Sequence, residues 1–158
     1  MKKYLGTIFL NILKVWGAAW VGMLVALIPM YIARFNSVPP KTENLLIGIV
    51  DGVGTIVTLF LFFKWEGRKR EIRLASPKEI CLYSVAPTIL WAVIGCLCVF
   101  NPAMVLTGVI YFSNAVLGLE AVTEYAFFQP FPFALLFAVF YSAAIFGGYM
   151  YGRRFSDL

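Results

Sequence analysis

Histidine is absent from the 158 residues, and only 13% of the chain is charged. Without histidine, the chain lacks the commonest metal ligand and the commonest general base of enzymes. We also find no glycine-rich phosphate loop, no metal-ligand spacing and no set of serine, histidine and acid. We therefore expect no metal, no cofactor and no enzymatic activity.

Cysteine is scarce as well, and its three copies do not suggest a disulfide. Cys81, Cys96 and Cys98 all lie in one apolar run. On a helix, Cys96 and Cys98 point about 200° apart and so face away from each other. We expect all three to act as small buried hydrophobic residues.

Apolar residues, by contrast, make up 61% of the chain, and the mean hydropathy is +0.85. A soluble domain is typically about half apolar, so this composition indicates an all-α integral membrane protein. The net charge of +5 does not point to nucleic acid, because the basic residues adjoin the apolar runs. The expected partner is the lipid bilayer, with the chain in a cytoplasmic or plasma membrane.

The segment that orients the chain is the basic bridge, residues 64–79, with the sequence KWEGRKREIRLASPKE. Lysine and arginine collect in the cytoplasmic loops of membrane proteins, so the bridge predicts the cytoplasmic face. Spans of about 20 apolar residues cross the hydrocarbon layer. We expect a single polytopic domain over 1–158 with four transmembrane helices at about 12–33, 45–65, 77–100 and 131–151, joined by a cytoplasmic loop at 66–76 and an extracytoplasmic segment at 101–130.

The distribution of basic residues agrees with both termini lying in the cytoplasm. Only Arg34 and Lys41 fall outside in this arrangement. Eleven fall inside: Lys2, Lys3, Lys14, Lys64, Arg68, Lys69, Arg70, Arg73, Lys78, Arg153 and Arg154. We expect Lys14, which lies within the first apolar run, to extend its ammonium group back to the lipid headgroups.

Residues 101–130 hold a shorter apolar run, from Ala103 to Leu119, that contains polar residues. If this run crossed the membrane, the last span would carry Arg153 and Arg154 to the outside, against the charge rule. We therefore expect an interfacial or re-entrant helix that begins near Pro102. Glu120 and Glu124 follow it and form an extracytoplasmic acidic candidate site.

Short motifs mark where helices begin and where they pack. Ser76-Pro77-Lys78-Glu79 matches a capping box and predicts that the third span begins at Pro77. Small residues spaced four apart allow helices to approach closely. Such rows are Ala18, Gly22 and Ala26 in the first span, Gly48 and Gly52 in the second, and Ala144, Gly148 and Gly152 in the fourth.

Asp51, inside the second span, is the strongest candidate for a functional site. A carboxylate in a membrane span is costly and by default marks an ion, proton or substrate path. Thr55 and Thr58 share its helix face and join it as ion or substrate candidates. The structural alternative is that Asp51 is satisfied by Thr55, by water entering from outside, by the nearby helix N-terminus, or by Arg34 at the outer end of the first span.

Three functions follow as expectations. The first is a non-enzymatic subunit or partner module of a larger membrane assembly, such as a transport or envelope system, with Arg68, Lys69, Arg70 and Arg73 contacting lipid or a partner. The second is a small oligomeric transporter or channel around Asp51. The third is a membrane-surface enzyme that uses Glu120 and Glu124. The small-residue rows allow contacts with other membrane subunits or a homo-oligomer.

Overall fold

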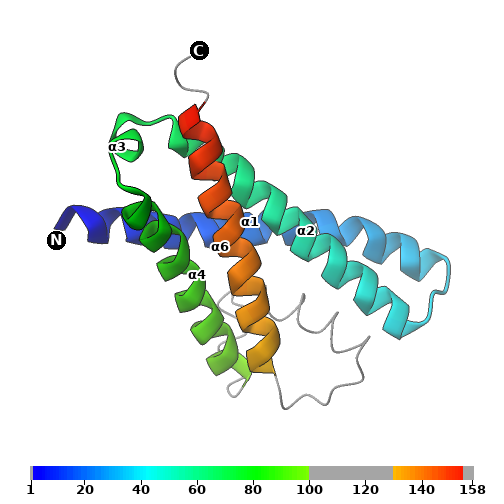
Figure 1. Ribbon diagram of the computed structural model, residues 1–158. Coiled ribbons are helices and arrows are strands. Elements are labelled where there is room, and N and C mark those ends of the chain that lie inside the picture. The colour runs from blue at the N-terminus through cyan, green and yellow to red at the C-terminus, as the bar shows by residue number, and fades with distance from the viewer. Residues whose placement is uncertain (1, 100–129, 155–158) are drawn as a thin grey trace.

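A computed structural model describes residues 2–99 and 130–154 of the chain. Every regular element in these two ranges is a helix, and Figure 1 shows their arrangement. The helices are α1 (Lys2–Phe35), α2 (Pro40–Gly67), α3 (Arg70–Arg73), α4 (Pro77–Val99) and α6 (Pro130–Arg154). The expected helix near Pro102, with Glu120 and Glu124, lies outside the described residues.

Two of these helices are long and apolar enough to cross a membrane: Leu5–Phe35 of α1 and Leu46–Gly67 of α2. The chain is thus an all-helical protein, within the described ranges, with two candidate membrane spans. Apolar side chains are widely exposed on both helices, including Phe9, Ile28 and Val53 at 61%, 61% and 55%. In a membrane, this surface would contact lipid tails.

Local sequence signals fix several helix ends. The Ser76 hydroxyl accepts a hydrogen bond from the Glu79 backbone N–H at 3.3 Å, and the Glu79 carboxylate accepts one from the Ser76 N–H at 2.6 Å. This is the capping box that the sequence predicts, and α4 begins at Pro77, directly after Ser76. Between α1 and α2, Ser37 takes a left-handed conformation (φ 53°), which lets the chain reverse within four residues.

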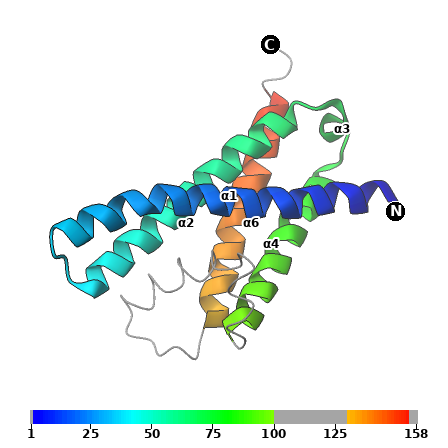
Figure 2. The same cartoon turned by 180° about the vertical axis from the view of Figure 1, so that it is seen from behind.

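The first two helices form an antiparallel hairpin, seen from opposite sides in Figures 1 and 2. Beside the turn, Arg34 pairs with Glu43 at 3.0 Å. Gly22 and Gly54 meet in the middle, and Lys14 pairs with Glu66 at 2.8 Å at the other end. Lys14 thus has an acid of the second helix as its partner, and the extension of its ammonium group to the headgroups stays a prediction.

The last two long helices, α4 and α6, also run antiparallel to each other. Thr88 of α4 lies 2.5 Å from Ser142 of α6, and Ala92 packs with Ala138 farther from the start of α4. The relation of α2 to α6 is parallel, because Thr55 lies near Tyr141 and Gly67 near Gly152. Hence α1 and α4 run in one direction, and α2 and α6 run in the opposite direction.

One main core lies where the four long helices cross. Its largest buried side chains come from α1, α2, α4 and α6: Val15, Leu59, Phe63, Ile80, Ile145 and Tyr149. The rings of Phe63 and Tyr149 meet edge to face, with centroids 4.9 Å apart. This core separates the middle of the α1–α2 hairpin from the end that carries the basic bridge.

Candidate functional site

Asp51 lies inside α2, eleven residues or about 16 Å from the helix start at Pro40. Its exposure is only 1%. Neither carboxylate oxygen makes a hydrogen bond of acceptable geometry with the described residues. Arg34, a suggested partner, is instead paired with Glu43 at the turn of the hairpin. A buried carboxyl group without such partners is the most unusual feature of the described residues, because burying a charge unpaired is costly.

Three residues from three helices surround this carboxyl group. Gly22 of α1 lies so close that a Cβ atom there would sit 2.8 Å from Asp51 Oδ1 and 2.8 Å from the Asp51 backbone oxygen. Thr55, one turn further along α2, is buried beside the carboxylate. Tyr141 of α6, which is 3% exposed, lies beside the Thr55 hydroxyl group. The carboxyl group therefore lies at a closely packed junction of three helices.

Thr58, the third residue predicted for this site, does not take part in the junction. Its hydroxyl donates a hydrogen bond to the Gly54 carbonyl at 2.7 Å, within its own helix. The structure thus brings Asp51 and Thr55 together and leaves Thr58 apart. Tyr141 was missed by the sequence reasoning, since a tyrosine in an apolar run gives no signal of what it faces.

The predicted packing residues lie at helix contacts or in buried positions. Ala18, Gly22 and Ala26 of α1 are buried, as are Gly48 and Gly52 of α2. On α6, a Cβ at Gly148 would lie 2.7 Å from the Phe60 carbonyl, and one at Gly152 would lie 3.0 Å from the Gly67 Cα. The sequence reasoning missed Gly54 and Gly67, the glycines that meet Gly22 and Gly152.

A second polar cluster lies near the start of α1. The amide of Asn11, which is fully buried, donates to the Tyr83 carbonyl at 3.1 Å and lies 2.9 Å from the Tyr149 hydroxyl. Next to it along α1, the Ile12 carbonyl accepts a hydrogen bond from the Trp91 indole at 3.0 Å. These bonds join α1 to α4 and α6. A lone asparagine within the run KKYLGTIFLNILK was the available signal for this cluster.

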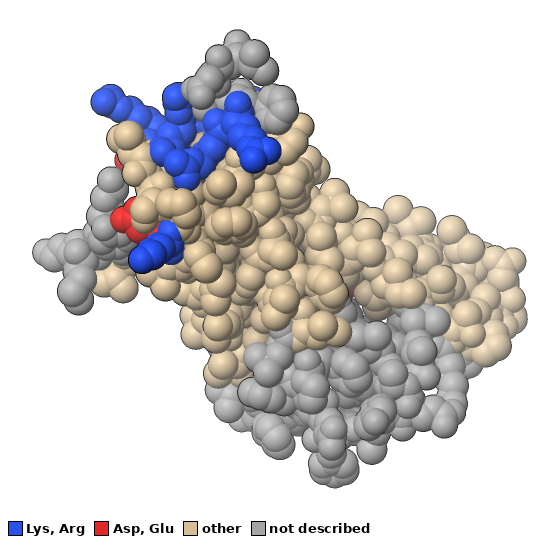
Figure 3. Space-filling model, viewed as in Figure 1, with Lys and Arg blue, Asp and Glu red and all other residues tan. Residues whose placement is uncertain are grey.

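Basic side chains gather at one end of the molecule, over α3 and the ends of α2 and α6 (Figure 3). We call this the basic end: Lys64, Arg68, Lys69, Arg70, Arg73, Lys78, Arg153 and Arg154. The predicted contact residues Arg68, Lys69, Arg70 and Arg73 are all exposed there. Lys69 pairs with Glu66, and Arg153 of α6 donates to the Arg73 carbonyl at 3.0 Å. The last contact attaches the end of α6 to the basic bridge.

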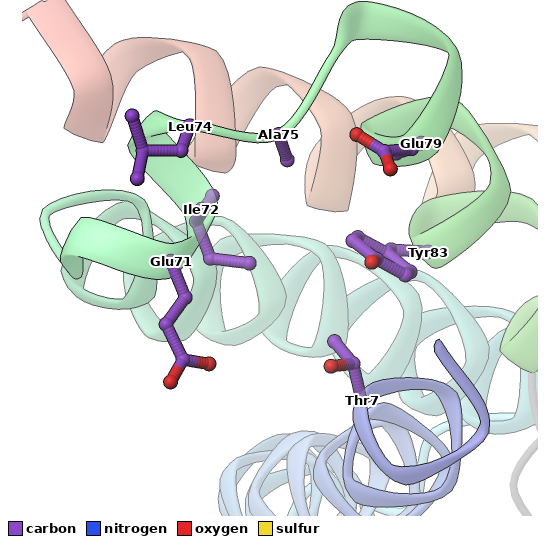
Figure 4. Close-up of a pocket in the computed structure, with 7 residues that line it drawn as sticks. All are labelled: Thr7, Glu71, Ile72, Leu74, Ala75, Glu79 and Tyr83. Atoms are coloured by element: carbon purple, nitrogen blue, oxygen red, sulfur yellow. The ribbon is translucent and has the colours of Figure 1, made fainter. Parts of the chain in front are cut away.

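A small pocket of about 90 Å³ opens beside the basic end (Figure 4). Thr7 of α1 and Tyr83 of α4 face each other across it, and Glu71 and Glu79 supply its two acids. Glu79 already caps α4 through Ser76. The remaining lining is apolar and comes from Ile72, Leu74 and Ala75.

Other chemistry-bearing residues do not converge. Cys81 is exposed on α4, so the expectation that it is buried was wrong. Among residues 2–99 and 130–154, no three His, Cys, Asp or Glu side chains are placed to hold a metal ion. No family model, curated protein or solved structure matches this chain.

Proposed function

We propose that this chain is a four-span membrane protein with both termini in the cytoplasm. We further propose that it serves as a non-enzymatic subunit or partner module of a larger membrane assembly. The proposal rests on one observation: the basic bridge, the first turns of α1 and the end of α6 all lie at one end of the molecule. The contacts Asn11–Tyr83, Asn11–Tyr149 and Arg153–Arg73 support this meeting.

The senses of the helices support the four-span arrangement. The helices α1 and α4 run away from the basic end, and α2 and α6 run toward it. Successive long helices therefore alternate in direction. The end of α4 and the start of α6 then lie on the same side, because these helices are antiparallel. A non-crossing segment between them agrees with that geometry. Each long helix has at least 23 residues, or about 34 Å, enough to cross the hydrocarbon layer.

The positive charge of the basic end favours a protein partner with an acidic surface. Among the described residues, eight basic side chains gather there with only three acids, Glu66, Glu71 and Glu79. Two of these acids are engaged: Glu66 with Lys14 and Lys69, and Glu79 with Ser76. Complementary charge across an interface mainly sets the partner's identity and orientation.

The test is purification from native membranes in mild detergent. We expect a partner to co-purify in fixed stoichiometry, and the double variant Arg68→Gln with Arg70→Gln to lose it. Arg34→Gln, at the turn of the α1–α2 hairpin, is the matched control and should keep the partner. Purification of the wild-type chain alone, or equal partner loss in both variants, would reject the proposal.

A second candidate function is supported by Asp51. A carboxyl group buried among three helices is typical of an ion or proton path in small oligomeric transporters and channels. Transport measured in reconstituted vesicles tests this candidate. Asp51→Asn should abolish transport while leaving expression and assembly intact, because the amide keeps the shape and loses the charge. Transport that survives this change would end the second candidate.

A further inference from the structure

We propose that Asp51 is a proton-binding site that controls the contact between α1 and α2: α1 packs at Gly22 when the carboxyl group is protonated and loosens when it ionises. The proposal does not depend on a partner at the basic end, and it holds whether or not the chain transports an ion. It rests on the burial of Asp51, its lack of hydrogen-bond partners and the closeness of Gly22.

The first step is the cost of the charged form. A carboxylate accepts hydrogen bonds and cannot donate them, so it requires several donors when it is removed from water. The described neighbours that offer donors are the hydroxyl groups of Thr55 and Tyr141, and neither makes a hydrogen bond of acceptable geometry with the carboxylate. A protonated carboxyl group can itself donate to the Thr55 oxygen. The neutral form therefore suits this junction better than the charged form.

The second step is the identity of the ligand. A metal cation such as Na⁺, Mg²⁺ or Ca²⁺ needs a shell of about six oxygens, which requires room around the carboxylate. Here, even one added carbon at Gly22 would lie 2.8 Å from Asp51 Oδ1. The junction thus has no space for a hydrated or coordinated ion on the α1 side. A proton needs no such space.

The third step is the coupling to packing. Gly22 is held between Asp51 and Gly54, so α1 and α2 touch through backbone atoms at the carboxyl group itself. Water can reach an ionised Asp51 from this side only if α1 moves away. Of the helices packed here, α6 contributes the titratable Tyr141, and α1 contributes the uncharged residues Gly22, Ala18 and Ala26. Among the described side chains of the hairpin, the nearest ion pair is Arg34–Glu43, eight residues away along α2, or about 12 Å.

The sign of the pH effect follows directly. The packed state binds a proton that the loosened state releases, so the packed state is favoured at low pH and loses stability as the pH rises. The equilibrium between the two states changes by up to about tenfold per pH unit across this range.

Disulfide cross-linking can measure this contact. A Cβ at Gly54 would lie 3.9 Å from the Val25 Cβ, close to the separation found in disulfides. We therefore choose Val25→Cys with Gly54→Cys, in a chain whose native cysteines are replaced by serine, reconstituted in vesicles. The same pair in a chain that also carries Asp51→Asn corrects for the pH dependence of thiol chemistry. The cross-linking rate in the chain that keeps Asp51, divided by the rate in the Asp51→Asn chain, should fall as the pH rises.

A ratio that stays constant with pH would overturn the proposal. Because the cysteine at Gly54 comes within 3.3 Å of the Gly22 Cα, a second measurement uses chains that keep both glycines. Infrared spectroscopy of the wild-type protein should show the carbonyl band of a protonated carboxylic acid at neutral pH. Asp51→Asn should remove the band and Glu43→Gln should keep it. The absence of the band from the wild type would likewise overturn the proposal.

Discussion

The Lys14 ammonium group lies 2.8 Å from the Glu66 carboxylate, and this ion pair closes the α1–α2 hairpin at the end opposite its turn. Arg34 and Glu43 form the corresponding pair beside the turn. The two pairs are about 20 residues apart along α1, or about 30 Å, which is the thickness of the hydrocarbon layer. The apolar part of the hairpin between them therefore has the length needed to cross a bilayer.

The Lys14–Glu66 pair should contribute measurably to stability. Its side chains are 27% and 17% exposed, and Glu66 also pairs with Lys69. We expect Glu66→Gln to lower the free energy of unfolding in mild detergent by about 1–2 kcal/mol, and Lys14→Met to cost less, because Glu66 keeps Lys69. The charge swap Lys14→Glu with Glu66→Lys should recover part of the loss. Equal effects of Lys14→Met and Glu66→Gln would contradict this account of the pair.

The glycines of this chain should respond to alanine in opposite directions. A Cβ at Gly152 would lie 3.0 Å from the Gly67 Cα and would also contact the Lys64 carbonyl, whereas a Cβ at Gly17 meets nothing within 4 Å. We expect Gly152→Ala to destabilise the protein by about 1–3 kcal/mol through overpacking. Gly17→Ala should stabilise it by up to about 1 kcal/mol, because alanine favours a helix. Unfolding in detergent measures the change in free energy for both variants. A change of the same sign in both would refute the close contact at Gly152.

Asn11 should matter more than an asparagine at the surface. Asn11→Ala leaves the buried Tyr149 hydroxyl and Tyr83 carbonyl without this partner, at a cost of about 1–3 kcal/mol. Asn36 also bonds a backbone carbonyl, that of Ile32 at 2.8 Å, but it is exposed, so Asn36→Ala should have a small effect. Thermal denaturation of the two variants makes the comparison. Similar changes in the two midpoints would show that the Asn11 cluster is not an anchor of α1.

Much of the helical framework can be predicted from the sequence, because hydrophobic length and capping act locally. The capping box at Ser76 places the start of α4, and the apolar runs match α1 and α2. The short helix α3 and the extension of α1 back to Lys2 were not predicted. They depend on contacts with distant segments, such as the Arg73 carbonyl with Arg153 and Asn11 with α4 and α6.

The candidate site was predictable in its central residue but not in its surroundings. Asp51 stands out in an apolar run, and the structure places it against Gly22 of α1. Tyr141, ninety residues later, could not be assigned to it, because nothing local specifies which helices cross. The pairing of Arg34 with Glu43 also depends on the geometry of the turn, which brings these residues together.

Membrane topology gives the last prediction. If the four-span arrangement is correct, a cysteine at Arg70 should be protected from an impermeant reagent in intact cells, whereas cysteines at Lys41 and Glu120 should react. The native cysteines are replaced in each chain, and labelling after permeabilisation confirms that the site at Arg70 can react. A cysteine added after Leu158 should behave like the one at Arg70, because Arg153 lies against the basic bridge. Labelling of this last cysteine in intact cells, with the one at Arg70 protected, would mean that residues 101–130 cross the membrane and that hydrophobicity outweighs the charge rule there.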